Sequence, residues 1–169
     1  MSGNEGMLTF SELTNRIHAG DIDTVILGFT DMQGRLVGKR ISARLFLDSV
    51  AEHGAECCNY LLAVDIDNNT VDGYKISSWK SGYGDMVMKP DLATLRQVPW
   101  IEGSAQVTAD LLTTSGEEVG PAPRSVLKKQ RARLEERDWT CMGATELEFL
   151  IFDDTYREAW AKGYNDLTP

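Results

Sequence analysis

One short stretch, residues 145–152, limits most strongly what this chain can fold into. It reads TELEFLIF and is rich in apolar, branched and aromatic residues, which predicts a β-strand. Side chains alternate between faces along a strand, so Glu146 and Glu148 point the same way, with Cα atoms roughly 7 Å apart. The opposite face carries the apolar side chains Leu147, Phe149 and Ile151. We therefore expect this strand to be buried.

Two neighbouring carboxylates on a buried strand need a positive partner. Burial removes water from each charge, and the two charges repel each other. A divalent cation meets both requirements, because Mg²⁺ and Mn²⁺ prefer oxygen ligands. Glu146 and Glu148 are therefore a candidate metal site. The alternative is that this face meets water and both glutamates are ordinary surface residues.

The charge balance disfavours a nucleic-acid-binding surface. Lysine and arginine number 17, aspartate and glutamate number 26, and the formal net charge is −9. Binding to a phosphate backbone needs a basic stripe, and the sequence has none. The apolar runs are also too short to span a membrane. The chain opens without a signal-peptide pattern and its three cysteines form no paired framework, so we expect a cytoplasmic location.

The first part of the chain predicts an α+β domain. Thr9 and Glu12 match a capping box, and apolar residues at helical spacing follow as far as Gly20. Further elements alternate with turn formers: a strand hairpin at 24–30 and 36–41, a helix at 42–54, and strands at 55–64, 85–88 and 105–111. We expect the helices to pack on one face of a sheet.

A long loop interrupts this domain at residues 65–84. The loop has little periodicity and holds Asp72 in an Asp-Gly turn. Loops of this length inside a compact domain are usually functional or disordered. Trp79 and Tyr83 indicate an ordered, docked loop.

The clearest boundary in the chain is the run GPAP at 120–123. Pro123 can start a helix, which continues to about Arg137 and leads to the strand at 145–152. No convincing apolar strand follows Asp153. We therefore expect an N-terminal helical segment at 1–20, a first domain at 21–117, and the start of a second, incomplete domain at 121–169.

Taken in order, the motifs resemble the glutamine synthetase family over nearly the whole chain. The motif of residues 146–149, ELEF, is similar to the ExEF strand of that family and is the most specific of them. The others are the hairpin FTD…G…GK at 29–39, VDG at 71–73 six residues before Trp79, DMVMKPD at 85–91, and PRSVLK at 123–128.

The resemblance implies a fold and an activity. The fold would be an N-terminal β-grasp domain followed by the start of a catalytic domain built on a curved antiparallel sheet. The activity would be that of an ATP-dependent ligase, which forms the γ-amide of glutamate with ammonia through γ-glutamyl phosphate. Such an enzyme makes glutamine and serves nitrogen metabolism. Members of the family form stacked rings, so a homo-oligomer is implied as well.

The resemblance also implies roles for three acidic residues. Glu146 and Glu148 would be ligands to the Mg²⁺ or Mn²⁺ ions that bridge the protein and the phosphates of ATP. Asp72 would bind ammonium and help to deprotonate it, at a site shared with a neighbouring subunit. This chemistry suits the residues, since phosphoryl transfer gathers negative oxygens and an ammonium ion must lose a proton before it attacks.

Two departures from the family pattern change what we expect. The family loop often reads FDGSSIxGW, whereas this chain has Tyr74 and Lys75 in place of the serine pair. A ligase that joins glutamate to a polyamine or another larger amine therefore stays open as an alternative. In addition, the glutamate- and nucleotide-binding motifs of the family lie beyond the ExEF strand. We therefore expect this chain to be an amino-terminal portion that lacks ligase activity by itself.

Two interpretations from other classes also stay open. The chain could be a non-catalytic β-grasp binding module that keeps the fold alone. It could also belong to a glycosidase, because a retaining enzyme holds its two carboxyl groups about 5 Å apart. No aromatic platform for a sugar flanks Glu146 and Glu148. The glycosidase is therefore a weaker interpretation than the ligase or the binding module.

Overall fold

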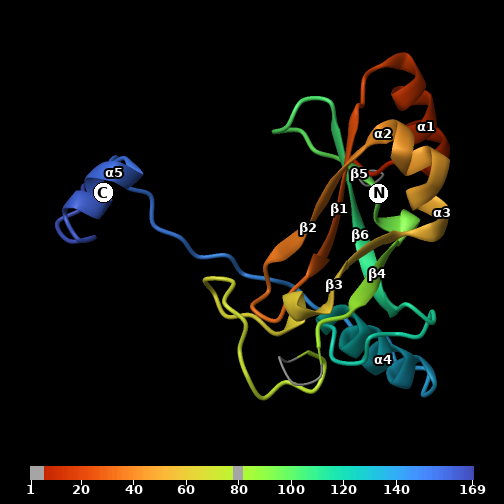
Figure 1. Cartoon of the computed structure of the whole chain (residues 1–169). Helices are drawn as coiled ribbons and strands as arrows, with labels where there is room; N and C mark the ends of the chain where they lie inside the picture. The colour runs from red at the N-terminus through yellow and green to blue at the C-terminus, as the bar shows by residue number, and fades with distance from the viewer. Residues whose placement is uncertain (1–5, 78–81) are drawn as a thin grey trace.

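The structure is a computed structural model that describes residues 6–77 and 82–169 (Figure 1). Its helices are α1 (Phe10–Ala19), α2 (Ala43–Leu45), α3 (Ala51–His53), α4 (Pro123–Glu135) and α5 (Tyr156–Ala161). A π-helical turn, Phe46–Val50, joins α2 to α3, and short 3-10 turns cover Asn59–Leu62 and Leu92–Thr94. Its strands are β1 (Thr24–Thr30), β2 (Leu36–Ser42), β3 (Ala55–Cys58), β4 (Asp85–Pro90), β5 (Arg96–Gln97) and β6 (Ser104–Thr113).

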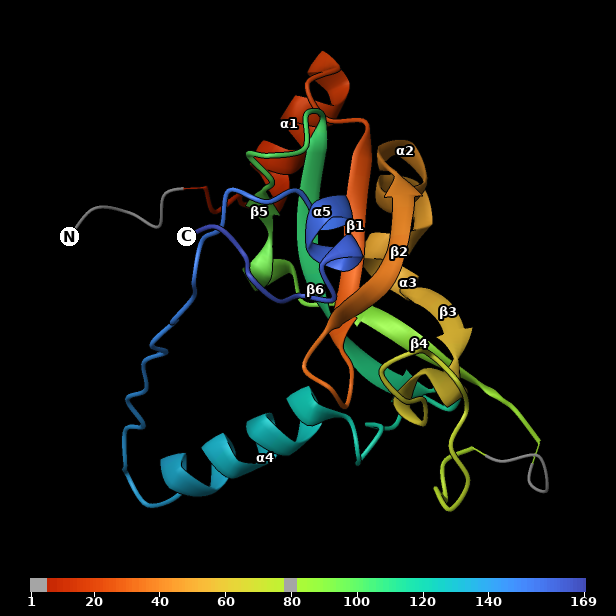
Figure 2. The same cartoon turned by 90° about the vertical axis from the view of Figure 1, so that its left-hand side faces the viewer.

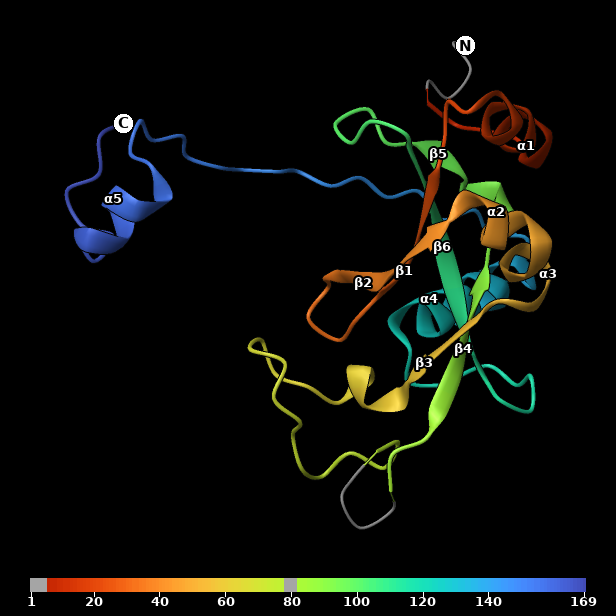
Figure 3. The same cartoon turned by 45° about the horizontal axis from the view of Figure 1, so that its top comes forward.

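The strands form one mixed sheet in the order β2-β1-β6-β4-β3, with β5 pairing to β6. β1 and β6 run parallel, with Thr24 opposite Ser104, and every other pair in this sheet is antiparallel. The sheet is strongly curled (Figure 3). Lys39 on the outer strand β2 donates a hydrogen bond of 2.6 Å to the carbonyl of Glu56 on the other outer strand, β3. The two ends of the sheet therefore approach each other, and the α+β fold class is confirmed.

Strand β1 lies at the centre of the packing. Its side chains Val25, Leu27 and Phe29 alternate into the core and are almost completely buried. On the next strand, Gly38 is paired with Gly28. A Cβ at position 38 would lie 2.0 Å from the Leu27 carbonyl oxygen, so only glycine fits there. Close packing against β1 thus explains why the second glycine of the FTD…G…GK hairpin, Gly38, is a glycine.

The helices α1, α2 and α3 lie on one side of the sheet, as expected (Figures 1 and 2). The predicted capping box is confirmed, with Thr9 and Glu12 bonded reciprocally, and Gly20 ends α1 in the left-handed region. Leu13 from α1 and Phe46 from the π-helical turn are fully buried against the sheet. The second predicted helix keeps its extent but contains a π-helical turn in its middle.

Outside these elements, one expected strand was wrong in its length, and two short elements were not expected. The strand predicted at 55–64 ends at Cys58, because Asn59 donates its backbone N–H to Gly84 and the chain turns there. Strand β5 was not expected, since two residues leave no periodic pattern. Helix α5 was missed although Thr155 and Glu158 form a capping box that the sequence displays.

Helix α4 lies at the end of the sheet opposite to α1 (Figure 2). Ion pairs fix its first two turns to the sheet. The Arg124 side chain binds Asp91, and its Nε lies 2.7 Å from the Asp110 carboxylate on β6. Lys128 binds the other oxygen of Asp110 at 2.7 Å. Burial would raise the pKa of Asp110, but Lys128 and Arg124 outweigh it and lower that pKa.

The division into domains at 1–20, 21–117 and 121–169 stays a prediction. The ion pairs of α4 bring the chain after Pro121 into contact with the sheet before it. Among the helices of residues 6–77 and 82–169, none combines the length and apolar character needed to cross a bilayer.

We predict that Arg124→Gln lowers the free energy of unfolding by roughly 1–3 kcal/mol, because it removes charge-assisted hydrogen bonds in a partly buried cluster. Chemical denaturation measures this change. Arg131→Gln is the matched control, since Arg131 belongs to an exposed ion pair on the same helix and should cost about 0.5 kcal/mol or less. Equal losses in both variants would contradict the structural role of the cluster.

Candidate functional site

The segment with the glutamate pair has no regular secondary structure in this fold. Residues 139–152 are extended and lead away from the sheet toward α5 (Figure 1). Glu146 and Glu148 are both exposed. The apolar side chains beside them are exposed too: Leu147 83%, Phe149 76%, Leu150 82% and Ile151 75%. The expectation of a buried strand at 145–152 is therefore wrong for the chain as it folds here.

The physical reason is the absence of a partner strand. A strand is stable only when its backbone N–H and C=O groups are paired. Within residues 6–77 and 82–169, no segment pairs with residues 145–152. An apolar sequence that would form a strand between neighbours therefore stays extended, with its side chains in water.

The carboxylates present do not make a complete metal site. In the part of the chain that the structure describes, no three Asp, Glu, His or Cys side chains are grouped so that they could hold a metal ion. Glu146 and Glu148 supply two ligands at most, on an exposed segment. As the chain folds here, they do not fit a bound Mg²⁺ or Mn²⁺ ion.

Asp72 belongs to the long loop between β3 and β4. This loop lies at the end of the sheet where α4 lies (Figure 1). Asp72 is exposed, and Gly73 after it takes a φ of +99°, which only glycine adopts readily. Trp79 lies outside the described residues. Tyr83 packs edge-on against Tyr60 with ring centroids 5.8 Å apart, so this end of the loop is docked as expected.

The side chain that anchors the first part of this loop is Arg35, in the turn of the β1–β2 hairpin. Its Nε and its backbone N–H donate to the Asp31 carboxylate at 2.7 and 2.8 Å. Asp31 is only 1% exposed. The rest of the guanidinium donates to the carbonyls of Ile66 at 2.6 Å and Asp65 at 3.3 Å, and to the Asn68 side chain at 3.2 Å.

Asn59 anchors the second part of the loop. Its side-chain amide donates to the Ile76 carbonyl at 3.0 Å and accepts from the Gly84 N–H at 3.2 Å. Next to Ile76, the Ser77 side chain is buried, and its hydroxyl has no hydrogen-bond partner among the described residues. The exposed stretch around Asp72 is thus held at both of its ends.

Sequence reasoning identified Asp31 only as a turn residue of the hairpin motif. The available signal was an aspartate followed four positions later by an arginine, which favours a local ion pair. The contacts of Arg35 with residues 65–68 could not be found in this way, because they join segments thirty residues apart.

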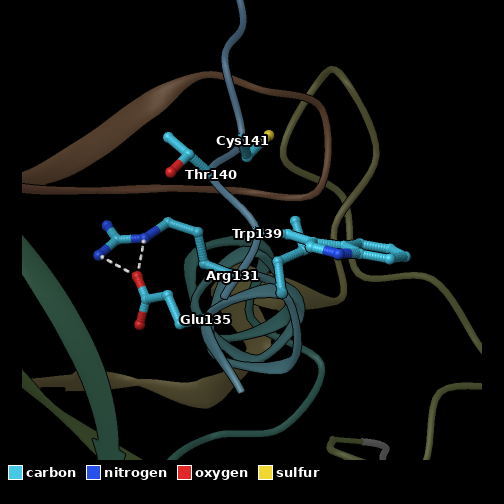
Figure 4. A pocket seen from close by; sticks show the side chains of 6 residues that line it. Arg131, Glu135, Trp139, Thr140 and Cys141 are labelled. Atoms are coloured by element: carbon cyan, nitrogen blue, oxygen red, sulfur yellow. Dashed lines mark hydrogen bonds and ion pairs between the residues drawn. The ribbon is translucent and has the colours of Figure 1, made fainter. Parts of the chain in front are cut away.

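A surface hollow of about 190 Å³ lies at the end of α4 (Figure 4). The Arg131–Glu135 ion pair lies on one side of it and Trp139 on the other, with Cys141 above. None of the predicted site residues lines it. It therefore plays no part in the candidate site.

We predict that the stability conferred by Asp31 depends on pH. Burial by itself would raise the pKa of Asp31, but hydrogen bonds from Arg35 and Gln33 outweigh it and lower that pKa below its ordinary value. A lowered pKa gives stability that is complete above the unfolded-state value of about 3.9 and is lost as the pH falls through the folded-state value.

Asp31→Asn should therefore destabilise the chain by roughly 1–3 kcal/mol at pH 7, and by less as the pH falls below about 4. Denaturation at several pH values measures the difference. Asp48→Asn is the control, because Asp48 belongs to an exposed ion pair of the same i,i+4 spacing. A difference between wild type and Asp31→Asn that stays constant from pH 7 to pH 2 would refute the prediction.

The chain is similar to a known family and to named proteins. A family model described as glutamine synthetase, catalytic domain, matches residues 121–168. The chain is 57% identical over 162 residues to a gamma-glutamylethanolamide synthetase of Streptomyces coelicolor, which covers 96% of this chain and 35% of that protein. It is 35% identical over 153 residues to a glutamate–isopropylamine ligase of a Pseudomonas species, covering 90% of this chain and 33% of the ligase.

A solved structure agrees with this relationship. The ADP complex of GmaS superposes with a TM-score of 0.59 and 25% identity, over 76% of this chain and 26% of that one. The chain spans about a third of the length of the curated relatives it matches. Together with the order of the motifs, these matches show that the chain belongs to the glutamine synthetase family.

Proposed function

We propose that the whole protein is an ATP-dependent ligase that joins the γ-carboxylate of glutamate to the nitrogen of an organic amine. The observation that carries this proposal is the 57% identity with a protein named gamma-glutamylethanolamide synthetase. A second relative is named for isopropylamine. Both names specify amines larger than ammonia, so they support the amine alternative over the glutamine synthesis that we expected first.

The Asp72 loop also supports an amine larger than ammonia. Tyr74 and Lys75 follow the Asp-Gly turn where the family often has two serines, and both are exposed. The aromatic ring of Tyr74 offers apolar surface to the carbon skeleton of an amine. An organic amine is protonated at neutral pH, and the Asp72 carboxylate offers the opposite charge.

The reaction requires two chemical steps. A carboxylate is a poor electrophile, so the γ-phosphoryl group of ATP is first transferred to the glutamate γ-carboxylate, giving γ-glutamyl phosphate and ADP. The amine then attacks the carbonyl carbon, and phosphate leaves. The amine must lose a proton to attack, and we assign to Asp72 the binding of the ammonium form and the acceptance of that proton.

Glu146 and Glu148 are proposed as metal ligands of the whole protein. The support is the ELEF motif, which lies inside the stretch that matches the catalytic-domain model. Residues 145–152 would form the expected strand once further sequence pairs with both of its edges. The two carboxylates would then share one face, and divalent cations prefer oxygen ligands of this kind.

We also propose that the whole protein is a homo-oligomer in which Asp72 contributes to the site of a neighbouring subunit. Asp72, Tyr74 and Lys75 are exposed in the single chain, which leaves them free to face another subunit.

The first test measures ADP release by the whole protein with glutamate and a panel of amines. We predict release that needs both glutamate and an amine such as ethanolamine, with ammonia a poorer acceptor. Asp72→Asn should lower kcat/KM for the amine by about 100-fold or more, because it removes the general base. Asp67→Asn removes an exposed carboxylate from the same loop and should change little. A preference for ammonia would refute the acceptor class.

The second test measures Mn²⁺ binding to the whole protein. Glu146→Gln combined with Glu148→Gln should weaken binding by about tenfold or more, since two anionic ligands are lost. The control removes two carboxylates from the end of α4, Glu135→Gln with Glu136→Gln, and should leave the affinity unchanged. Unchanged affinity in the first pair would favour the non-catalytic binding module instead.

A further inference from the structure

We propose that Arg35 is a positioning residue that fixes the loop carrying Asp72 and thereby sets where the acceptor amine is held. Its effect on the amine rests on the proposed function, whereas its hold on the loop does not. Four features of the structure lead to this inference.

The first feature is that the guanidinium has a fixed orientation. The Asp31 carboxylate accepts from the Arg35 Nε and backbone N–H with different oxygens, and also from the Gln33 N–H at 3.0 Å. This carboxylate is 1% exposed, so water competes little for it. Because the guanidinium is planar, fixing its Nε leaves the two terminal nitrogens aimed in set directions.

The second feature is that those nitrogens bind the loop, apart from one long contact of 3.5 Å from Nη2 to the Gln33 side chain in the same hairpin turn. Nη1 donates to the Ile66 carbonyl, and Nη2 donates to the Asp65 carbonyl and the Asn68 side chain. Gln33 adds a hydrogen bond of 2.7 Å to the Val64 carbonyl. The hairpin turn therefore holds residues 64–68 through four hydrogen bonds.

The third feature is that the anchored residues form a closed turn that leads directly to Asp72. The Asp65 carboxylate accepts from the N–H groups of Asp67 and Asn69, at 2.9 and 2.8 Å. Val64 and Thr70 form an isolated β-bridge, and the Val71 N–H donates to the Ala63 carbonyl at 2.9 Å. Asp72 is the next residue, so a shift of the turn moves its carboxylate.

The fourth feature is that Asp72 has no anchor of its own. Within residues 6–77 and 82–169, its side chain makes no hydrogen bond or ion pair. Its position therefore depends on the two ends of the loop, where Arg35 and Asn59 lie. Arg35 holds the part of the loop that precedes Asp72, through several hydrogen bonds that a lysine could not reproduce.

The experiment has two readouts. The first is amide hydrogen exchange of residues 63–77, which reports the loop whether or not the protein is a ligase. The second is the set of KM values of the whole protein for amine, glutamate and ATP. Arg35→Gln removes the guanidinium and its hydrogen bonds to Asp31 and to residues 65–68. Arg35→Lys keeps only the positive charge. Arg44→Gln is the control, since Arg44 belongs to an exposed i,i+4 ion pair.

If Arg35→Gln is too unstable to study because Asp31 is left buried without its partner, Asn68→Gly replaces it. Asn68 has a φ of +65°, which glycine adopts without strain, so this change removes one acceptor of Arg35 and keeps the backbone.

We expect Arg35→Gln to speed exchange at residues 63–77 and to raise KM for the amine, each by about tenfold, since charge-assisted hydrogen bonds are lost. KM for glutamate and ATP should stay within about twofold, as a positioning role for the amine alone requires. Arg35→Lys should give an intermediate effect, Asn68→Gly a smaller one, and Arg44→Gln none.

Unchanged exchange at residues 63–77 in both Arg35→Gln and Asn68→Gly would overturn the inference. So would faster exchange with an unchanged KM for the amine, or equal rises in all three KM values. If the whole protein ligates no amine at all, the proposed function fails, and hydrogen exchange alone then decides whether Arg35 holds the loop.

Discussion

Strand pairing is the constraint on which the rest of this structure depends. Strand β6 pairs with β1, β4 and β5, and through them it joins the whole sheet. Its alternate residues Ala105, Val107, Ala109 and Leu111 are buried at the centre of the core. Each strand that has a partner strand is held in place by its backbone hydrogen bonds to that partner. Residues 145–152, which are at least as apolar, have no partner in the described chain and stay extended in water.

The curl of the sheet determines where the candidate site residues lie. The β1–β2 hairpin turn reaches the loop that follows β3 because the outer strands approach each other, as the Lys39 contact with β3 demonstrates. This approach lets Arg35 contact residues 65–68 and lets the hairpin support the Asp72 loop. At the same end of the sheet, the ion pairs of Arg124 and Lys128 fix the start of α4.

Local features of the fold could be predicted from the sequence, whereas features that depend on distant partners could not. The Thr9 capping box, strand β1 and the hairpin turn each arise from a few neighbouring residues, and each was predicted. The end of β3 depends on Asn59 meeting Gly84, which no local pattern reveals. The same reason applies to Arg35, whose acceptors lie thirty residues away.

The glutamate pair illustrates this limit most clearly. Its alternation predicts a strand with both carboxylates on one face, but a strand needs neighbours, and the expected buried face is in water here. Exposure of Glu146 and Glu148 would have counted against a ligase if the motif had been the only support. Family membership has independent support in the 57% identity, which extends over almost the whole chain.

We propose that residues 145–152 form a paired strand in the whole protein, with Glu146 and Glu148 on one face. Amide hydrogen exchange of this segment in the whole protein tests this arrangement. Slow exchange across the segment, slower still at residues 146–148 when Mn²⁺ is added, is the predicted result. Exchange as fast as that of an unfolded peptide, with and without Mn²⁺, would contradict it.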